Sequence, residues 1–370
     1  MIYLDANATT PVDPAVLEVM LPFWCENPAN ASASYAAGRK ARKAIESARA
    51  QVGAMIGAEA REIVFTSGAT ESINAVHASV RHLWPERPTL ITTKVEHAAG
   101  LECAMRWEES GGTVCHIKVD ANGLIDLAEL REALQSNDAA LVSILWANNE
   151  TGVIQPMREI AALAHEHGAL VHADAVQMIG KAPLDAKVDL LSLSGHKFHA
   201  PKGIGALFVS QRVRFEPLLI GGGQEGGRRS GTENVPGIVG LGKAAELAMS
   251  ACSSELRDAF EAHLVSEWPE VVIHGVKASR LPNTSSLCFP GIDAAGMLIL
   301  LDQAGVACSA GSACHSASLH PSHVLEAMGY EARHAASTLR FSFSRMNTMA
   351  EVAEAVAKVL QAARKLRDLT

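Results

Sequence analysis

A lysine and an aspartate carry the most informative chemistry in this 370-residue chain. Lys197 follows an apolar stretch that ends at Leu193, and Asp174 closes the short apolar run 170–173. A lysine amine can hold an aldehyde cofactor covalently, and a carboxylate can keep a pyridine nitrogen protonated so that the ring accepts electrons. Pyridoxal phosphate enzymes need both groups, so the pair points to amino-acid chemistry.

A turn of small residues, Ser67–Ser72, follows an expected strand over 63–66 and opens an expected helix over 69–81. Backbone N–H groups at a helix N-terminus attract an anion, so the turn is suited to a cofactor phosphate. Serine and threonine also cap helices in general, and alone the turn would be weak support. Combined with the lysine and the aspartate it predicts a phosphate site, to which Ser194 and His196 could donate further hydrogen bonds.

Two more side chains are placed to meet a cofactor ring. Gln177 comes three residues after Asp174 and could reach a hydroxyl on the ring. His97 opens a helix directly after an expected strand, at the end of the strand where sites in α/β proteins assemble. A single histidine is more often structural, but this position favours a ring that stacks on the cofactor and exchanges protons.

Strand-like and helix-like segments alternate through the first two thirds of the chain. This alternation predicts an α/β protein with a largely parallel sheet covered by helices on both faces. The expected strands are 63–66, 90–93, 114–119, 141–146, 170–173, 190–193 and 205–209, and the expected helices are 69–81, 97–109, 127–134 and 157–167. The glycine-rich run 221–227 is expected to form an irregular loop.

The chain is longer than one hydrophobic core usually supports, about 250–300 residues, so we expect two domains. Residues 13–257 would form a large cofactor-binding domain, and residues 1–12 with 258–370 would form a small domain. The character of the sequence changes near a long helical stretch at 239–264. The small domain is predicted from the segments that follow it, with strands at 271–273, 285–289 and 338–343 and helices at 295–303 and 349–369.

The composition excludes several classes of protein. A net charge of -8 gives no electrostatic reason to bind nucleic acid or an anionic membrane. No apolar run reaches the ~20 residues that cross a bilayer, and the first residues lack the pattern of a signal peptide, so the cytoplasm is expected. The seven cysteines contain no CxxC pair, and His165–His167 reads as a helix surface, so no metal site is expected.

Eight motifs, taken together and in order, strongly resemble the NifS/IscS-type cysteine desulfurases, which are class V aminotransferases. The resemblance implies a PLP-dependent transferase fold of type I, with a mostly parallel seven-stranded sheet in the large domain, and a homodimer. The motifs are Leu4–Thr10, Ser67–Ser72, Asn148–Glu150, His172–Gln177, Ser194–Lys197, Arg229–Thr232, Ala307–Ser318 and Arg340–Ser342.

The same resemblance implies a role for individual residues. Catalysis would fall to Lys197, Cys314 and His97. Pyridoxal 5'-phosphate would be bound by Ala69, Thr70, His97, Asp174, Gln177, Ser194, His196 and Lys197, with Thr232 reaching the phosphate of the neighbouring subunit. Asn149 and Arg340 would lie near the substrate carboxylate, which the planar fork of an arginine can bind through two hydrogen bonds.

By this resemblance L-cysteine becomes L-alanine, and its sulfur passes to Cys314 as a persulfide for an acceptor protein. An ordinary thiol is only a few per cent ionised at neutral pH, so Cys314 needs an activator. His97 is implied by the family, and the adjacent His315 is a local alternative. Small residues around Cys314 suggest an exposed segment. Cys308 could assist, although a buried inert thiol is the commoner case for such a residue.

Two other functions stay open on the sequence alone. A class V aminotransferase or selenocysteine lyase would not need Cys314, and a sulfur-handling scaffold would bind partners with little turnover. The sulfur acceptor stays equally open, because iron–sulfur cluster assembly, tRNA thiolation and other sulfur modifications would begin with the same half-reaction.

Overall fold

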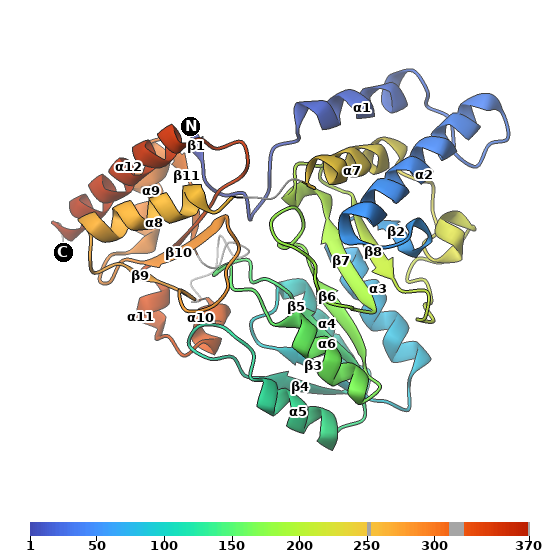
Figure 1. Cartoon of the computed structure of the whole chain (residues 1–370), viewed down its shortest axis with the longest axis horizontal. Helices are drawn as coiled ribbons and strands as arrows, with labels where there is room; N and C mark the ends of the chain where they lie inside the picture. The colour runs from blue at the N-terminus through green and yellow to red at the C-terminus, as the bar shows by residue number, and fades with distance from the viewer. Residues whose placement is uncertain (250–252, 311–321, 369–370) are drawn as a thin grey trace.

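The computed structural model describes residues 1–249, 253–310 and 322–368. Figure 1 shows a large body built on one broad sheet and a smaller body that contains the C-terminal helix. Each body has its own hydrophobic core. The larger core gathers residues from Val16 to Leu281, and the smaller one combines Ile2 and Leu4 with residues from Phe260 to Ala363.

Seven strands form the large sheet, in the order β2-β8-β7-β6-β5-β3-β4. All neighbouring strands pair in parallel except at β8, which runs antiparallel to both β2 and β7. The bounds are β2 (Ile63–Thr66), β3 (Thr89–Thr93), β4 (Thr113–Ile117), β5 (Ala139–Leu145), β6 (Leu170–Asp174), β7 (Leu190–Ser194) and β8 (Gly205–Val209).

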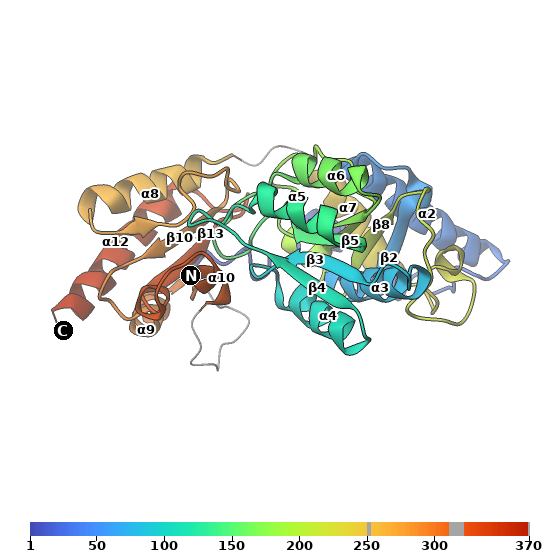
Figure 2. The ribbon, with the colours of Figure 1, turned by 90° about the horizontal axis from the view of Figure 1, so that it is seen from below.

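Successive residues of these strands serve different cores because side chains alternate between the faces of a sheet. Leu190 belongs to the cluster that contains Trp107, whereas Leu191 belongs to the main core. Figure 2 shows α3 and α4 on one side of this sheet and α5, α6 and α7 on the other. The helices are α1 (Pro14–Cys25), α2 (Ala36–Ile56), α3 (Ala69–Leu83), α4 (Ala98–Glu109), α5 (Leu127–Ser136), α6 (Met157–Glu166) and α7 (Val235–Leu247), with the 3-10 turns η1 (Ala60–Glu62), η2 (Gly195–Lys197) and η3 (Gln224–Gly227).

The smaller body is built on a four-stranded antiparallel sheet, in the order β12-β13-β10-β9, and on a parallel pair, β1 with β11. The strands are β1 (Ile2–Tyr3), β9 (Val272–Ile273), β10 (Thr284–Cys288), β11 (Val306–Ala307), β12 (Ser309–Ala310) and β13 (Thr338–Ser342). The helices are α8 (Glu255–Glu267), α9 (Ala294–Gln303), α10 (His323–Ala327), α11 (Ala332–Ala335) and α12 (Met349–Arg367).

The first ten residues connect the two bodies. The N–H of Leu4 donates to Ala307 O at 2.8 Å, and its carbonyl accepts from Ser342 N at 2.7 Å. Thr10 N then donates to His196 O at 2.8 Å, beside the large sheet. One short segment therefore makes main-chain hydrogen bonds to both bodies.

The predicted helix over 239–264 is wrong, because α7 ends at Leu247 and α8 begins at Glu255. Two serines favour the new start. Ser253 Oγ accepts from Glu255 N at 3.2 Å, and Ser254 Oγ donates to the Asp258 carboxylate at 2.6 Å. Such side-chain bonds to the first turn compete with a continuous helix.

Candidate active site

The carboxyl ends of β5, β6 and β7 and the turn before α3 surround a cavity of about 530 Å³. This is the edge of an open α/β sheet where ligand sites form. The cavity brings together residues that lie far apart in the sequence. Ten of the predicted site residues line it: Ala69, Thr70, His97, Asn149, Asp174, Gln177, Ser194, His196, Lys197 and Arg340.

Asp174 is the last residue of β6 and its side chain is buried. One carboxylate oxygen, Oδ1, accepts from Val176 N at 3.0 Å. Burial raises the pKa of Asp174, and the hydrogen bond from Val176, followed by the charged forms of His97 and Lys197, opposes that rise. A protonated ring nitrogen is the kind of partner that stabilises a buried carboxylate in its charged form.

Lys197 ends the short turn η2 directly after β7. Its Nζ donates to Asn7 O at 2.6 Å and to Ala8 O at 2.8 Å. These carbonyls come from the segment that links the two bodies, so the N-terminus helps to hold the amine in the cavity. The sequence reasoning placed Asn7 in a motif but gave it no role.

The turn at 67–70 leads into the N-terminus of α3, which begins at Ala69 and has no side-chain cap, a setting in which helix N–H groups can attract an anion. Gly68 has φ +154°, a conformation that residues with a side chain rarely adopt, and a Cβ there would lie 3.6 Å from Ser194 Oγ. Gly205 pairs with both Thr66 and Ser194, and a Cβ at this position would lie 2.7 Å from Gly68 Cα. Glycine at both positions therefore lets the turn sit directly against β8.

Two charged side chains flank this turn. Glu71 accepts hydrogen bonds from Ser67 N at 2.8 Å and from Arg229 Nε at 2.9 Å. The positive charge of Arg229 offsets the negative charge of this carboxylate, which lies near the expected anion site. His196 shares a hydrogen bond with Thr9 Oγ1 at 3.1 Å. Burial, followed by the charges of nearby lysines, lowers the pKa of His196 to about 4, so the ring is neutral at pH 7 and serves as a hydrogen-bond partner.

His97 caps the N-terminus of α4, where its Nδ1 accepts from Ala99 N at 3.2 Å. An accepting Nδ1 carries no proton, so the neutral ring has its proton on Nε2. The cap fixes the ring at the mouth of the helix while the rest of the side chain lines the cavity.

Arg340 lies in the middle of β13 and is only 1% exposed. Its Nη1 donates to Asn149 O at 3.0 Å and its Nη2 to Asp5 Oδ1 at 2.7 Å. Within the described part of the chain, its buried Nε has no hydrogen-bond partner. An unmet donor beside the cavity suits a carboxylate ligand, because leaving a buried donor unpaired is costly.

Two predicted positions, Thr232 and Cys314, are not among the described residues that line the cavity. Thr232 is exposed and does not line the cavity. Cys314 lies outside the described residues. Gln177 reaches the cavity, but its amide is also bonded to Asn7 and Lys181. Cys308 is described, and burial, followed by the charge of Asp5, raises the pKa of its thiol to about 12, which favours an inert thiol over an assisting one.

Sequence reasoning missed several residues of the site. Asn7, Ala8, Thr9, Lys202 and Gly203 also line the cavity. Asn7, Ala8 and Thr9 belong to the N-terminal motif, and Lys202 and Gly203 follow Lys197 closely in the sequence. Their place in the cavity depends on contacts between distant parts of the chain, which local patterns do not reveal. Among the described residues there is no group of three His, Cys, Asp or Glu side chains that could hold a metal ion. Within the same ranges, no helix combines the length and apolar character needed to cross a membrane.

A family model described as "Aminotransferase class-V" matches residues 2–354. A solved NifS-like protein superposes on the chain with a TM-score of 0.91 at 38% identity, and covers 99% of this chain and 100% of its own. The chain therefore belongs to the class V aminotransferases, and the predicted fold of type I is confirmed.

Relatives narrow the class. The cysteine desulfurase of Trichormus azollae is 46% identical over 100% of this chain and 94% of its own length. That of Gluconacetobacter diazotrophicus is 48% identical over 100% of this chain and 95% of its own length. A solved structure of SspA in complex with cysteine matches with a TM-score of 0.84 at 36% identity, and covers 93% of this chain and 99% of its own. Within its class the chain belongs with the cysteine desulfurases, as its motifs predicted.

Proposed function

We propose that this protein binds pyridoxal 5'-phosphate and converts L-cysteine to L-alanine, with the sulfur passing to Cys314 as a persulfide. One observation carries the proposal. Lys197, with its amine, Asp174, with its buried carboxylate, and Arg340, with its guanidinium, line one cavity together with the turn that opens α3. That set matches the cofactor's aldehyde, ring nitrogen and phosphate together with a substrate carboxylate.

Each end of the cofactor has a partner among these residues. The turn at Ala69 and Thr70, with Ser194 and His196, would hold the phosphate, and Thr232 would reach the phosphate of a partner subunit. Asp174 would pair with the ring nitrogen, Gln177 with the ring hydroxyl, and His97 would stack on the ring. When bound, the cofactor supplies an electron sink for the bonds at the substrate Cα.

The residues of the chain perform the remaining tasks. Arg340, with Asn149, binds and orients the substrate carboxylate. The amine of Lys197, held by the Asn7 and Ala8 carbonyls until it is needed, removes the Cα proton and returns a proton to the same carbon before alanine leaves. His97 moves a proton at its Nε2. As the thiolate of Cys314 forms a bond to the substrate sulfur, the bond between Cβ and sulfur breaks, and its electron pair stays with carbon, which takes a proton to become the methyl group of alanine.

The setting of the enzyme follows from the same reasoning. We propose a homodimer in the cytoplasm that hands its sulfur to an acceptor protein and has no direct role with nucleic acid. Iron–sulfur cluster assembly, tRNA thiolation and other sulfur modifications all fit this half-reaction.

The test is to incubate the loaded enzyme with L-cysteine, without reductant, and to locate added sulfur by peptide mass spectrometry. One extra sulfur on the Cys314 peptide together with released alanine is expected. Cys314→Ala should lose turnover and keep its cofactor, whereas the matched Cys308→Ala should stay active. Alanine released while Cys314 stays unmodified would overturn the persulfide step and favour a lyase.

A further inference from the structure

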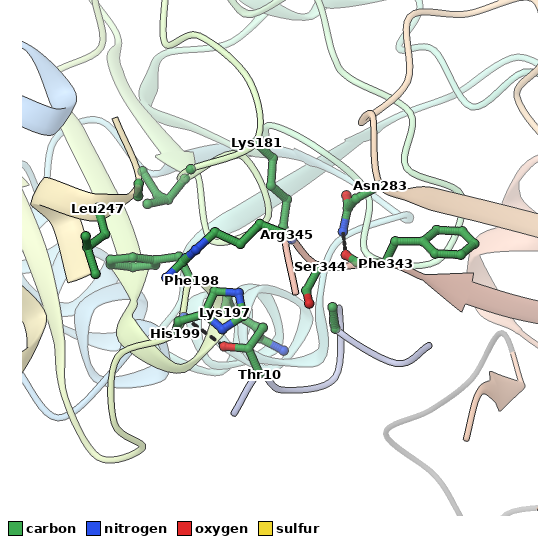
Figure 3. Close-up of a pocket in the computed structure, with 14 residues that line it drawn as sticks. Thr10, Lys181, Lys197, Phe198, His199, Leu247, Asn283, Phe343, Ser344 and Arg345 are labelled. Atoms are coloured by element: carbon green, nitrogen blue, oxygen red, sulfur yellow. Dashed lines mark hydrogen bonds between the residues drawn. The ribbon is translucent and has the colours of Figure 1, made fainter. Parts of the chain in front are cut away.

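A second, smaller cavity of about 70 Å³ lies against Lys197. Figure 3 shows Lys181, Arg345 and His199 around it, next to Lys197. Lys197 also lines the main cavity, so it borders both spaces. Four of the fourteen residues that line the small cavity are cationic or titratable, namely Lys181, Lys197, His199 and Arg345, and of these four only Lys197 has a task in the proposed reaction.

Lys181 contacts the cofactor side of the site through two amides. Its Nζ donates to Gln177 Oε1 at 2.6 Å and to Asn7 Oδ1 at 3.3 Å. Gln177 Nε2 in turn donates to Asn7 O at 3.1 Å, and the same Asn7 O accepts from Lys197 Nζ at 2.6 Å. Lys181, Gln177, Asn7 and Lys197 thus form one connected set of hydrogen bonds.

The chemistry of these groups allows only one orientation of the Gln177 amide. An ammonium group only donates, so it must face the amide oxygen, and a main-chain carbonyl only accepts, so it must face the amide nitrogen. Both contacts of Gln177 agree with that assignment. One N–H of Nε2 is used by Asn7, and the second is left for an acceptor in the main cavity, which Gln177 lines.

The positive charge of Lys181 lies near that of Lys197. Lys197 and Lys181 bind the carbonyl and the side chain of one residue, Asn7, and two like charges at such close quarters disfavour each other. Lys181 also helps to lower the pKa values of His196 and His199. The other charged groups nearby are Lys202, which acts on His196, Arg345, which is paired with Asp13, and Asp174 across the main cavity.

We propose that Lys181 is a positioning residue that turns the Gln177 amide so that it donates to the ring oxygen of the cofactor, and whose charge keeps the nitrogen of the Lys197–cofactor bond unprotonated. This inference rests on the proposed function, because it needs pyridoxal phosphate in the main cavity. It assigns a task to a residue that touches neither the cofactor nor the substrate.

The test is a pH titration of the visible absorption band of the loaded enzyme, without cysteine, in three variants. Lys181→Met loses both the donor and the charge, and its titration midpoint should rise by about one pH unit. Lys181→Gln keeps a donor for Gln177 Oε1 and loses the charge, so a smaller rise is expected. Lys181→Arg keeps both and can extend into the small cavity, so its midpoint should stay near that of the wild type.

Lys187→Met is the matched control, because Lys187 is exposed and its loss removes the same charge from the surface. Its midpoint should equal that of the wild type. An unchanged midpoint in Lys181→Met, with the cofactor fully bound, would overturn this inference and leave the proposed function intact. A midpoint that rises equally in Lys181→Arg would overturn it as well. Wild-type protein that takes up no pyridoxal phosphate would overturn the proposed function and this inference together.

Discussion

The two sheets contribute to the cavity in different ways. The large sheet places Asp174, Ser194 and Lys197 where its strands end, and the turns that follow carry them into the cavity. The small sheet contributes Arg340 from the middle of β13, fully buried and paired with Asp5. Asp174 and Ser194 are the last residues of their strands, whereas Arg340 is buried in the middle of its strand and also lines the cavity. The proposed cofactor residues therefore come from strand ends of the large sheet, and the proposed substrate residue Arg340 comes from the middle of a strand in the small sheet.

The largest expected effect is on the large-sheet side. Lys197→Ala should lower alanine formation by about 10³-fold or more, because it removes both the covalent holder of the cofactor and the proposed base. The measurement is turnover at saturating cysteine, with the exposed Lys187→Ala as control. Turnover within tenfold of the wild type would remove Lys197 from the mechanism.

On the small-sheet side, Arg340→Lys should mainly affect binding. A lysine keeps the charge but cannot present the Nε edge, so KM for cysteine should rise about 100-fold while the cofactor absorption stays unchanged. Arg333→Lys, on an exposed side chain paired with Glu331, is the control. A fall in kcat at constant KM would place Arg340 in the chemical step instead and would blur the contrast between the sheets.

Each body also contains one buried ion pair with two hydrogen bonds, Arg49–Glu225 in the large body and Arg280–Glu261 in the small one. Glu225 has φ +51° and also accepts from Phe65 N at 2.9 Å, so it anchors the glycine-rich segment that the sequence predicted to be irregular. Glu225→Gln and Glu261→Gln should each cost about 3 kcal/mol in the free energy of unfolding.

Urea unfolding of both variants checks this prediction. Cofactor binding is measured in the same variants, because the segment that contains Glu225 leads directly to Arg229, which binds Glu71 beside the turn at 67–70. Glu225→Gln should therefore also weaken cofactor binding, and Glu261→Gln should not. Equal losses of cofactor affinity in the two variants would contradict the assignment.

The last prediction concerns the dependence of stability on pH. Burial raises the pKa of Glu96 to about 8; its hydrogen bond from Thr93 opposes that rise, and the charge of Asp174 adds to it. The folded state thus keeps a proton that the unfolded chain releases near its ordinary pKa of 4.5, so stability falls as pH rises between these values, by at most about 1.4 kcal/mol per pH unit.

Glu96→Gln removes the titratable carboxyl group. The free energy of unfolding should then decrease less between pH 5 and pH 8 than it does in the wild type. The exposed Glu132→Gln is the control. Urea midpoints measured across this range should separate the Glu96 variant from the wild type increasingly toward high pH. Parallel curves would show that Glu96 is ionised throughout.

Much of the site was predictable from the sequence because strand ends and local motifs carry it. An apolar run followed by small or charged residues is a local signal, and it marks Asp174, Lys197 and the turn before α3. Asn7 and Lys181 carry no such local signal. Their part in the site depends on contacts between Asn7 and residues about 170 to 190 positions away. The break between α7 and α8 was missed for a different reason, since two serines can sit within a helix as well as cap one.

The link between the first and the last strands has a consequence for synthesis. Leu4 completes its hydrogen bonds only with Ala307 and Ser342, and the Asn7 and Ala8 carbonyls that hold Lys197 lie just beyond it. The residues that leave the ribosome first must therefore wait until β13 has emerged before they take their final places. Since domains fold largely as units during translation, the large sheet forms ahead of its own active site. The protein should therefore reach its full affinity for the proposed cofactor only late, after the chain has been synthesised.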